Sequence, residues 1–196
     1  MKKINVRDLV NIAIFSVVYI LSFYIPGMLG FFGPPFMFVG WIIGIVLGGI
    51  VLMLLMARVP KVGTLSVVGL ITGLIMTPGH TALVLVACPL FGFVADLIMS
   101  NCGKNDALQA TRAILAYAVF KLWIVVPLIP IIFNADAYYE TITATMGQEY
   151  SDSMRSLFTP TIIGIWAVVI FIVALSSGWL GARTARKHFH RAGLTR

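Results

Sequence analysis

Residues 161–182 read TIIGIWAVVIFIVALSSGWLGA and contain no charged side chain. A helix of about 20 apolar residues, rising about 1.5 Å per residue, crosses the roughly 30 Å hydrocarbon core of a bilayer. The basic residues Arg183, Arg186, Lys187, Arg191 and Arg196 follow directly. Because Lys and Arg beside a span stay on the cytoplasmic side, this segment predicts an integral membrane protein with its C-terminus inside.

The composition of the whole chain supports the same class. The chain has 196 residues, of which 60% are hydrophobic and 11% are charged, whereas soluble domains carry about 25% charged residues. We therefore expect a single membrane domain over residues 1–196. The net charge of +7 is spread over short clusters between apolar runs, so we expect no nucleic-acid partner. Cys88 and Cys102 do not have a metal or redox spacing, and neither a metal nor a cofactor is expected.

Six apolar runs predict an all-α fold with six transmembrane helices. The runs cover about 8–30, 36–57, 62–77, 82–100, 113–133 and 161–182. The turns on one side contain Lys2, Lys3, Arg7, Arg58, Lys61, Lys104 and Arg112, and the segments on the other side contain only Arg155. This alternation predicts that both termini are cytoplasmic. Glycines at every fourth position, Gly40, Gly44 and Gly48 in the second run and Gly69 and Gly73 in the third, predict close packing between helices.

The longest polar segment, 134–158, is acidic and is expected outside the cell. Its apolar residues Tyr138, Tyr139, Ile142, Met146 and Tyr150 recur every three or four positions, which is typical of an amphipathic helix. Two interpretations are open. The segment is either a helix lying on the outer surface or a lid over an outward-facing pocket.

The chain contains no motif of a hydrolase, protease or nucleotide-binding loop, so we expect no enzyme activity and no ATP hydrolysis by this chain. Lys121 is the most informative single residue, because it lies near the middle of a span, where a charge is costly. It is interpreted as the floor of a pocket for an anionic ligand, as an ion-pair partner of Asp96, or as a side chain that reaches toward the inner surface. On a regular helix Trp123 points away from Lys121, and the two share a cavity only if the helix is irregular.

Short motifs follow one another along nearly the whole chain. They are Arg7-Asp-Leu-Val-Asn-Ile-Ala-Ile14, Thr77-Pro-Gly-His-Thr81, Gly92-Phe-Val-Ala-Asp-Leu97, Ala116-Tyr-Ala-Val-Phe-Lys-Leu-Trp123, Asp136-Ala-Tyr-Tyr139, Gly147-Gln-Glu-Tyr150 and Lys187-His-Phe-His-Arg-Ala-Gly193. With six short spans and no ATPase motif, the chain resembles the substrate-binding S component of an energy-coupling factor (ECF) transporter. It resembles most closely the Trep_Strep family of membrane proteins.

This resemblance implies a bacterial inner or plasma membrane protein with the six-helix S-component fold. It implies assembly with an EcfT-type coupling subunit and two ABC-type ATPases, and capture of a small metabolite or vitamin-like solute that is released inward when the subunit topples. The family's Ala-x-x-x-Ala contact corresponds here to Ala13-Ile-Phe-Ser-Val17, so Ala13 and Ser16 are the candidate partner contacts. The second alanine is replaced by Val17, and Lys121 also departs from the family's usual small or neutral residue.

The same resemblance places the solute pocket among the outer loops and outer helix halves. The candidate substrate-binding residues are Lys121, His80, Thr77, Thr81, Tyr117, Tyr138 and Tyr139. The basic tail is expected to contact anionic lipid. A small membrane enzyme, and a stand-alone channel or scaffold, are the alternative functions.

Overall fold

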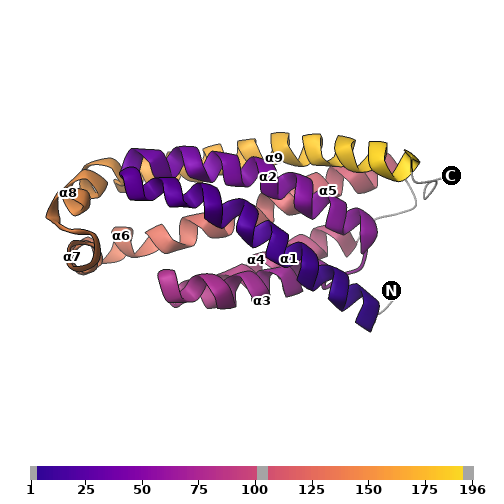
Figure 1. Cartoon of the computed structure of the whole chain (residues 1–196), viewed down its shortest axis with the longest axis horizontal. Helices are drawn as coiled ribbons and strands as arrows, with labels where there is room; N and C mark the ends of the chain where they lie inside the picture. Colours follow the sequence, from indigo (N-terminus) through magenta and orange to yellow (C-terminus); the bar gives the residue numbers. More distant parts are fainter. Residues whose placement is uncertain (1–3, 101–105, 192–196) are drawn as a thin grey trace.

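The computed structural model describes residues 4–100 and 106–191, with side chains omitted for 106–108 and 187–191. Within these residues the chain is helical and has no strand. The order is α1 (Val6–Gly27), the 3₁₀ helix η1 (Met28–Phe32), α2 (Pro34–Arg58), α3 (Thr64–Met76), the 3₁₀ helix η2 (Thr77–Gly79), α4 (Leu83–Ser100), α5 (Asp106–Lys121), the 3₁₀ helix η3 (Leu122–Leu128), α6 (Ile129–Phe133), α7 (Ala135–Met146), α8 (Gln148–Leu157) and α9 (Pro160–Arg191). The long helices form an elongated bundle with α7 and α8 at one end and the start of α1 and the end of α9 near the other (Figure 1).

Five helical segments are long and apolar enough to cross a membrane. They are Val6–Phe32, Pro34–Arg58, Leu83–Ser100, Gln109–Phe133 and Pro160–Arg186. The predicted third span is also an apolar helix, but with its 3₁₀ extension it covers only Thr64–Gly79, which is shorter than a full span. The all-α membrane fold is therefore confirmed with five candidate spans, and the sixth span stays a prediction.

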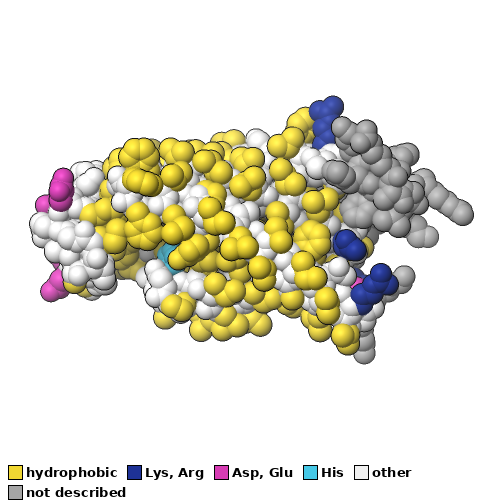
Figure 2. Space-filling view, in the orientation of Figure 1, with side chains coloured by type: hydrophobic (Ala, Val, Ile, Leu, Met, Phe, Trp, Pro, Cys, Tyr) yellow, Lys and Arg dark blue, Asp and Glu magenta, His cyan; other side chains and the backbone are white. Residues whose placement is uncertain are grey.

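Charge is separated between the two ends of the bundle. Figure 2 shows a largely apolar surface between acidic side chains at the α7–α8 end and basic side chains at the opposite end. We call the first the acidic end, with Asp136, Glu140, Glu149 and Asp152, and the second the basic end, with Arg7, Arg58, Lys61, Arg183 and Arg186. Lys104 and the side chains of 187–196, including most of the basic tail, lie outside the described residues.

The predicted glycine faces are confirmed as helix contacts. A Cβ at Gly44 of α2 would lie 2.7 Å from the Phe23 ring of α1, and one at Gly48 would lie 3.0 Å from the Tyr19 ring. Both distances are shorter than ordinary van der Waals contact. Gly69 and Gly73 pack in the same way against α4. Small residues thus let the α1–α2 and α3–α4 pairs approach closely, as expected where lipid removes the usual apolar driving force between helices.

The fifth predicted span, 113–133, is not one regular helix. It begins as α5, changes to the 3₁₀ helix η3 after Lys121 and ends as α6. Pro127 and Pro130 lack an N–H, so the α-helical bonds to the carbonyls of Trp123 and Val126 cannot form. The 3₁₀ form has about 3.0 residues per turn instead of about 3.6, which reduces the angle between residues two apart from about 160° to about 120°.

The predicted amphipathic helix over 134–158 is broken in two at Gly147, whose φ is 90°. The Tyr139 hydroxyl donates to the Phe158 carbonyl at 3.3 Å, and the Ser151 hydroxyl donates to the Tyr139 carbonyl at 3.1 Å. The Tyr150 hydroxyl donates to the Gly30 carbonyl at 2.9 Å. These bonds hold α7 and α8 together and attach them to η1, so that the pair covers the acidic end of the bundle.

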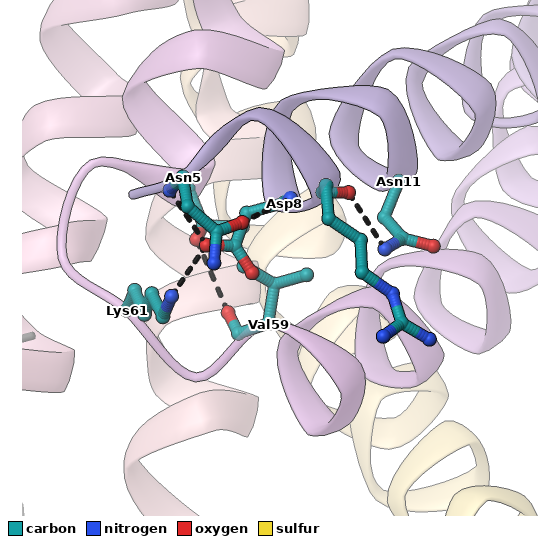
Figure 3. A network of polar contacts seen from close by, with 7 residues as sticks. Asn5, Asp8, Asn11, Val59 and Lys61 are labelled. Atoms are coloured by element: carbon teal, nitrogen blue, oxygen red, sulfur yellow. Dashed lines mark hydrogen bonds and ion pairs between the residues drawn. The ribbon is translucent and has the colours of Figure 1, made fainter. Parts of the chain in front are cut away.

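A polar network fixes the basic end (Figure 3). Asn5 and Asp8 form a reciprocal capping box at the start of α1, with bonds of 2.8 and 2.9 Å. Asp8 also pairs with Lys61 from the turn between α2 and α3. The Thr64 hydroxyl donates to the Val59 carbonyl at 3.1 Å and closes the same turn. The first helix is thereby connected to the turn that precedes α3.

Candidate functional site: a caged lysine beneath an aromatic cavity

Lys121 lies at the junction of α5 and η3, and its side chain is completely buried, with 0% of its surface exposed. Its ammonium donates to the Tyr19 hydroxyl of α1 at 2.9 Å. The ammonium nitrogen also lies 4.3 Å from the centroid of the Phe23 ring, 4.5 Å from that of Tyr19 and 5.9 Å from that of Trp123. These are cation–π distances, so an aromatic cage surrounds the amine.

Within the described residues Lys121 has no carboxylate partner, since the two ion pairs there are Lys61–Asp8 and Arg155–Asp136. Asp96 accepts from the backbone N–H of Leu65 at 3.1 Å and of Ser66 at 2.8 Å, and so caps the start of α3 from the neighbouring α4. The suggested Lys121–Asp96 pair is therefore absent. The lysine also does not reach toward the surface, because its ammonium ends inside the cage.

The cage is built by matched spacing on α1 and α2. Tyr19 and Phe23 are four residues apart and share one face of α1, as Gly44 and Gly48 share one face of α2. Gly44 leaves room for Phe23, and Gly48 leaves room for Tyr19. The Phe23 ring meets the Trp123 ring edge-on with centroids 5.3 Å apart. The packing of α1 on α2 thus positions the rings that receive the lysine from α5.

Hydrogen-bond donors exceed acceptors at this position. The Tyr19 hydroxyl accepts both from Lys121 and from the Trp123 indole N–H, the latter at 3.1 Å. An ammonium has three N–H donors and a phenol has one O–H donor. Two N–H groups of Lys121 and the O–H of Tyr19 therefore have no acceptor among the described residues. The site can receive a group that brings negative charge and several lone pairs.

A cavity of about 60 Å³ lies on the other side of two of the cage residues. It is lined by Phe23, Met37, Trp41, His80, Trp123, Ile124, Pro127, Leu128 and Tyr138. Pockets for small molecules usually measure about 300–1,000 Å³, and this cavity is large enough for a few water molecules only. Phe23 and Trp123 line this cavity and also lie within cation–π distance of the Lys121 ammonium, whereas Lys121 itself is not a lining residue.

Two predicted site residues, His80 and Tyr138, lie at this cavity. His80 follows η2, and its Nδ1 is 2.9 Å from the Met76 carbonyl oxygen. Tyr138 comes from α7, and burial raises the pKa of its hydroxyl to about 12, so the hydroxyl stays protonated at neutral pH. The segment 134–158 therefore contributes a cavity wall, as a lid would. That the segment 134–158 opens and closes as a lid stays a prediction.

The other predicted residues are placed differently. The Thr77 hydroxyl donates to the Gly73 carbonyl at 2.6 Å, and the Thr81 hydroxyl is buried without a hydrogen-bond partner among the described residues. Tyr117 does not line the cavity, and its hydroxyl donates to the Ile45 carbonyl of α2. Tyr139 packs in the apolar cluster beneath α7 and α8.

The two candidate partner contacts on α1 also differ from each other. Ala13 is exposed on the outside of the bundle. Ser16 is fully buried, so it cannot contact a partner on that surface as the chain is folded here. The exposed face of α1 instead presents apolar side chains such as Val10, Ile14 and Val17.

Sequence reasoning missed Tyr19, Phe23, Met37 and Trp41. A usable signal was present for the first two, because an aromatic pair at i, i+4 on one span faces a glycine pair at i, i+4 on the next. No comparable signal marked Met37 or Trp41. In the part of the chain that the structure describes, no group of three His, Cys, Asp or Glu side chains could hold a metal ion.

These features define a multi-pass integral membrane protein with a buried polar site next to an aromatic cavity. The family model described as "Hypothetical bacterial integral membrane protein (Trep_Strep)" matches residues 6–191, and the chain belongs to this family. No curated protein and no solved structure matches the chain.

Proposed function

We propose that the chain is the substrate-binding membrane subunit of an ATP-driven ECF-type importer. The observation that supports this most is the buried Lys121, which has no carboxylate partner among the described residues and lies next to a cavity of aromatic side chains. An ionisable residue inside a membrane span is costly, and one that faces a partner or a cavity marks a solute or ion site by default. Membership of a bacterial integral membrane family agrees with a transport role.

The proposed orientation follows from the charges at the two ends. Basic residues beside spans favour the cytoplasm, so the basic end with both termini is inside and the acidic end with α7 and α8 is outside. The cavity, whose wall includes Tyr138 of α7, then receives solute from outside. In this proposal the short apolar helix Thr64–Gly79 is the remaining membrane helix of a six-helix fold.

The proposed cycle needs partners, because the chain contains no nucleotide-binding loop. An EcfT-type coupling subunit and two ABC-type ATPases supply the energy, and toppling of the loaded subunit releases the solute inward. The coupling subunit contacts the exposed face of α1 at Ala13, beside Val10 and Val17. Basic side chains at the inner end contact anionic lipid.

Co-expression with an EcfT-type subunit and its two ATPases tests the proposal. We expect the four chains to purify together and Ala13→Leu to reduce recovery of the complex. Gly164→Leu is the matched control, because Gly164 is exposed on α9 and has open space around it. Failure to associate, combined with catalytic turnover or ion conduction by the isolated chain, would favour a membrane enzyme or a channel instead.

A further inference from the structure

We propose that the cavity and the caged lysine together bind a small planar aromatic acid with a single carboxylate. This inference rests on the proposed function and names the class of solute that the site takes. The carboxylate would lie against Lys121 and Tyr19, and the ring would lie near Trp41 and Tyr138, in the cavity as enlarged by displacement of Phe23 or Trp123.

The number of free hydrogen-bond donors at the site favours a carboxylate as the charged group of the ligand. Among the described residues, Lys121 leaves two N–H groups and Tyr19 leaves one O–H without an acceptor, while the Trp123 indole N–H already donates to Tyr19. A carboxylate has two oxygens with about four lone-pair positions and no donor, so it complements all three free hydrogens. A carboxamide of the same shape brings an NH₂ group that finds no acceptor among these atoms, and an unpaired buried donor weakens binding.

The single positive charge of the Lys121 ammonium favours a ligand with a single negative charge. The described groups near the Lys121 ammonium are a phenol oxygen, three aromatic rings and the buried thiol of Cys88, none of which carries a formal charge as a phenol, ring or thiol. One carboxylate therefore makes a neutral buried pair. A phosphate dianion would leave one negative charge uncompensated in a region of low dielectric, where such a charge is strongly disfavoured.

The aromatic walls of the cavity favour a ligand whose remaining part is flat and mostly apolar. Its walls carry the rings of Phe23, Trp41, Trp123 and Tyr138, and aromatic faces and edges favour another ring in stacked or edge-on contact. Phe23 and Trp123 touch both the cavity and the ammonium, so displacing one of them joins the two spaces. The incoming carboxylate offsets the lost cation–π contact, because a charge-assisted hydrogen bond is the stronger interaction.

His80 adds a preference at the cavity wall. The Met76 carbonyl can only accept, so the 2.9 Å contact assigns the proton of a neutral imidazole to Nδ1 of His80. The remaining ring nitrogen, Nε2, is then an acceptor. A ring N–H or hydroxyl on the solute that reaches this exposed side chain would complement Nε2.

Calorimetric titration of the full-length chain in detergent tests this with benzoate, benzamide and phenyl phosphate as probes. We expect benzoate to bind at least about tenfold more tightly than either of the others, because a hydrogen bond to a charged partner contributes more than a neutral one. Lys121→Met should remove this preference, and Tyr19→Phe should reduce it several-fold. Tyr117→Phe is the matched control, since it removes a buried phenol oxygen that bonds to Ile45 away from the cavity.

Equal affinity for benzoate and benzamide, or an unchanged preference in Lys121→Met, overturns the inference. If Lys121→Met does not accumulate, Tyr19→Phe decides, and an unchanged benzoate affinity in that variant is then the refuting result. Association with the coupling subunit and ATPases without any preference for benzoate would refute the solute class and leave the proposed function standing. Benzoate binding through Lys121 by a chain that never joins those subunits would support the solute class and refute the proposed function.

Discussion

Replacing Gly44 by alanine tests the packing that builds the cage. The new Cβ would lie 2.7 Å from the Phe23 ring and 3.0 Å from the Phe23 Cα, so the α1 backbone itself must move. Overpacking of this kind costs about 1–3 kcal/mol. Alanine also favours a helix over glycine by about 0.5–1 kcal/mol, so the net loss in the free energy of unfolding is about 0–2.5 kcal/mol.

Gly164→Ala is the matched control for this change. Gly164 lies inside α9 with nothing within 4 Å of the new Cβ, so the same substitution brings only the gain in helix propensity. The difference between the two variants therefore isolates the overpacking cost, about 1–3 kcal/mol in favour of Gly164→Ala. Unfolding in mixed micelles with increasing SDS, followed by circular dichroism, measures both. Equal unfolding free energies in the two variants would refute the tight contact between α1 and α2.

Three further substitutions are predicted from the structure. Asp96→Ala removes the acceptor for the first N–H groups of α3 and should cost about 1–2 kcal/mol in the same SDS assay, whereas a cost near zero would contradict the cap. Lys61→Met breaks a partly exposed ion pair with Asp8 and should cost no more than about 1 kcal/mol, and a larger loss would show that the network of Figure 3 acts as a unit. Gly147→Ala places a Cβ at a φ of 90° and should cost about 1–2 kcal/mol, with protease cleavage between α7 and α8 as the local measurement; unchanged cleavage would argue against strain there.

The membrane fold was predictable because lipid makes strong demands on sequence. The run 161–182 had to be a helix, since backbone groups in hydrocarbon need partners within the same segment. The glycines of α2 had to face a neighbour for a similar reason, because only small residues allow close helix approach. These rules depend on local sequence alone, and the helices and glycine contacts that they predict are the parts of the fold that the structure confirms.

The site was less predictable because it depends on which helices meet. Lys121 was identifiable from its depth in a span, but its partner Tyr19 is 102 residues away and could not be paired with it by spacing. The helical wheel placed Trp123 on another face, and the change to a 3₁₀ helix after Lys121 altered that angle. Tyr117 shares the predicted face of Lys121, but its hydroxyl bonds to the backbone of α2 and it does not line the cavity.

The distance in sequence between Lys121 and Tyr19 has a consequence for biogenesis. Chains fold from the N-terminus as they are synthesised, so α1 and α2 are in the membrane before α5 emerges. The lysine would cost about 2.5–3.5 kcal/mol to place alone at the centre of the bilayer. In the α1–α2 pair, Tyr19 packs on Gly48 and Phe23 packs on Gly44, so the aromatic surface that binds the ammonium is formed before α5 arrives. Contact with this surface lowers the cost of inserting the lysine. The residue that makes insertion of the fifth segment difficult is thus also the one that docks it in the correct place.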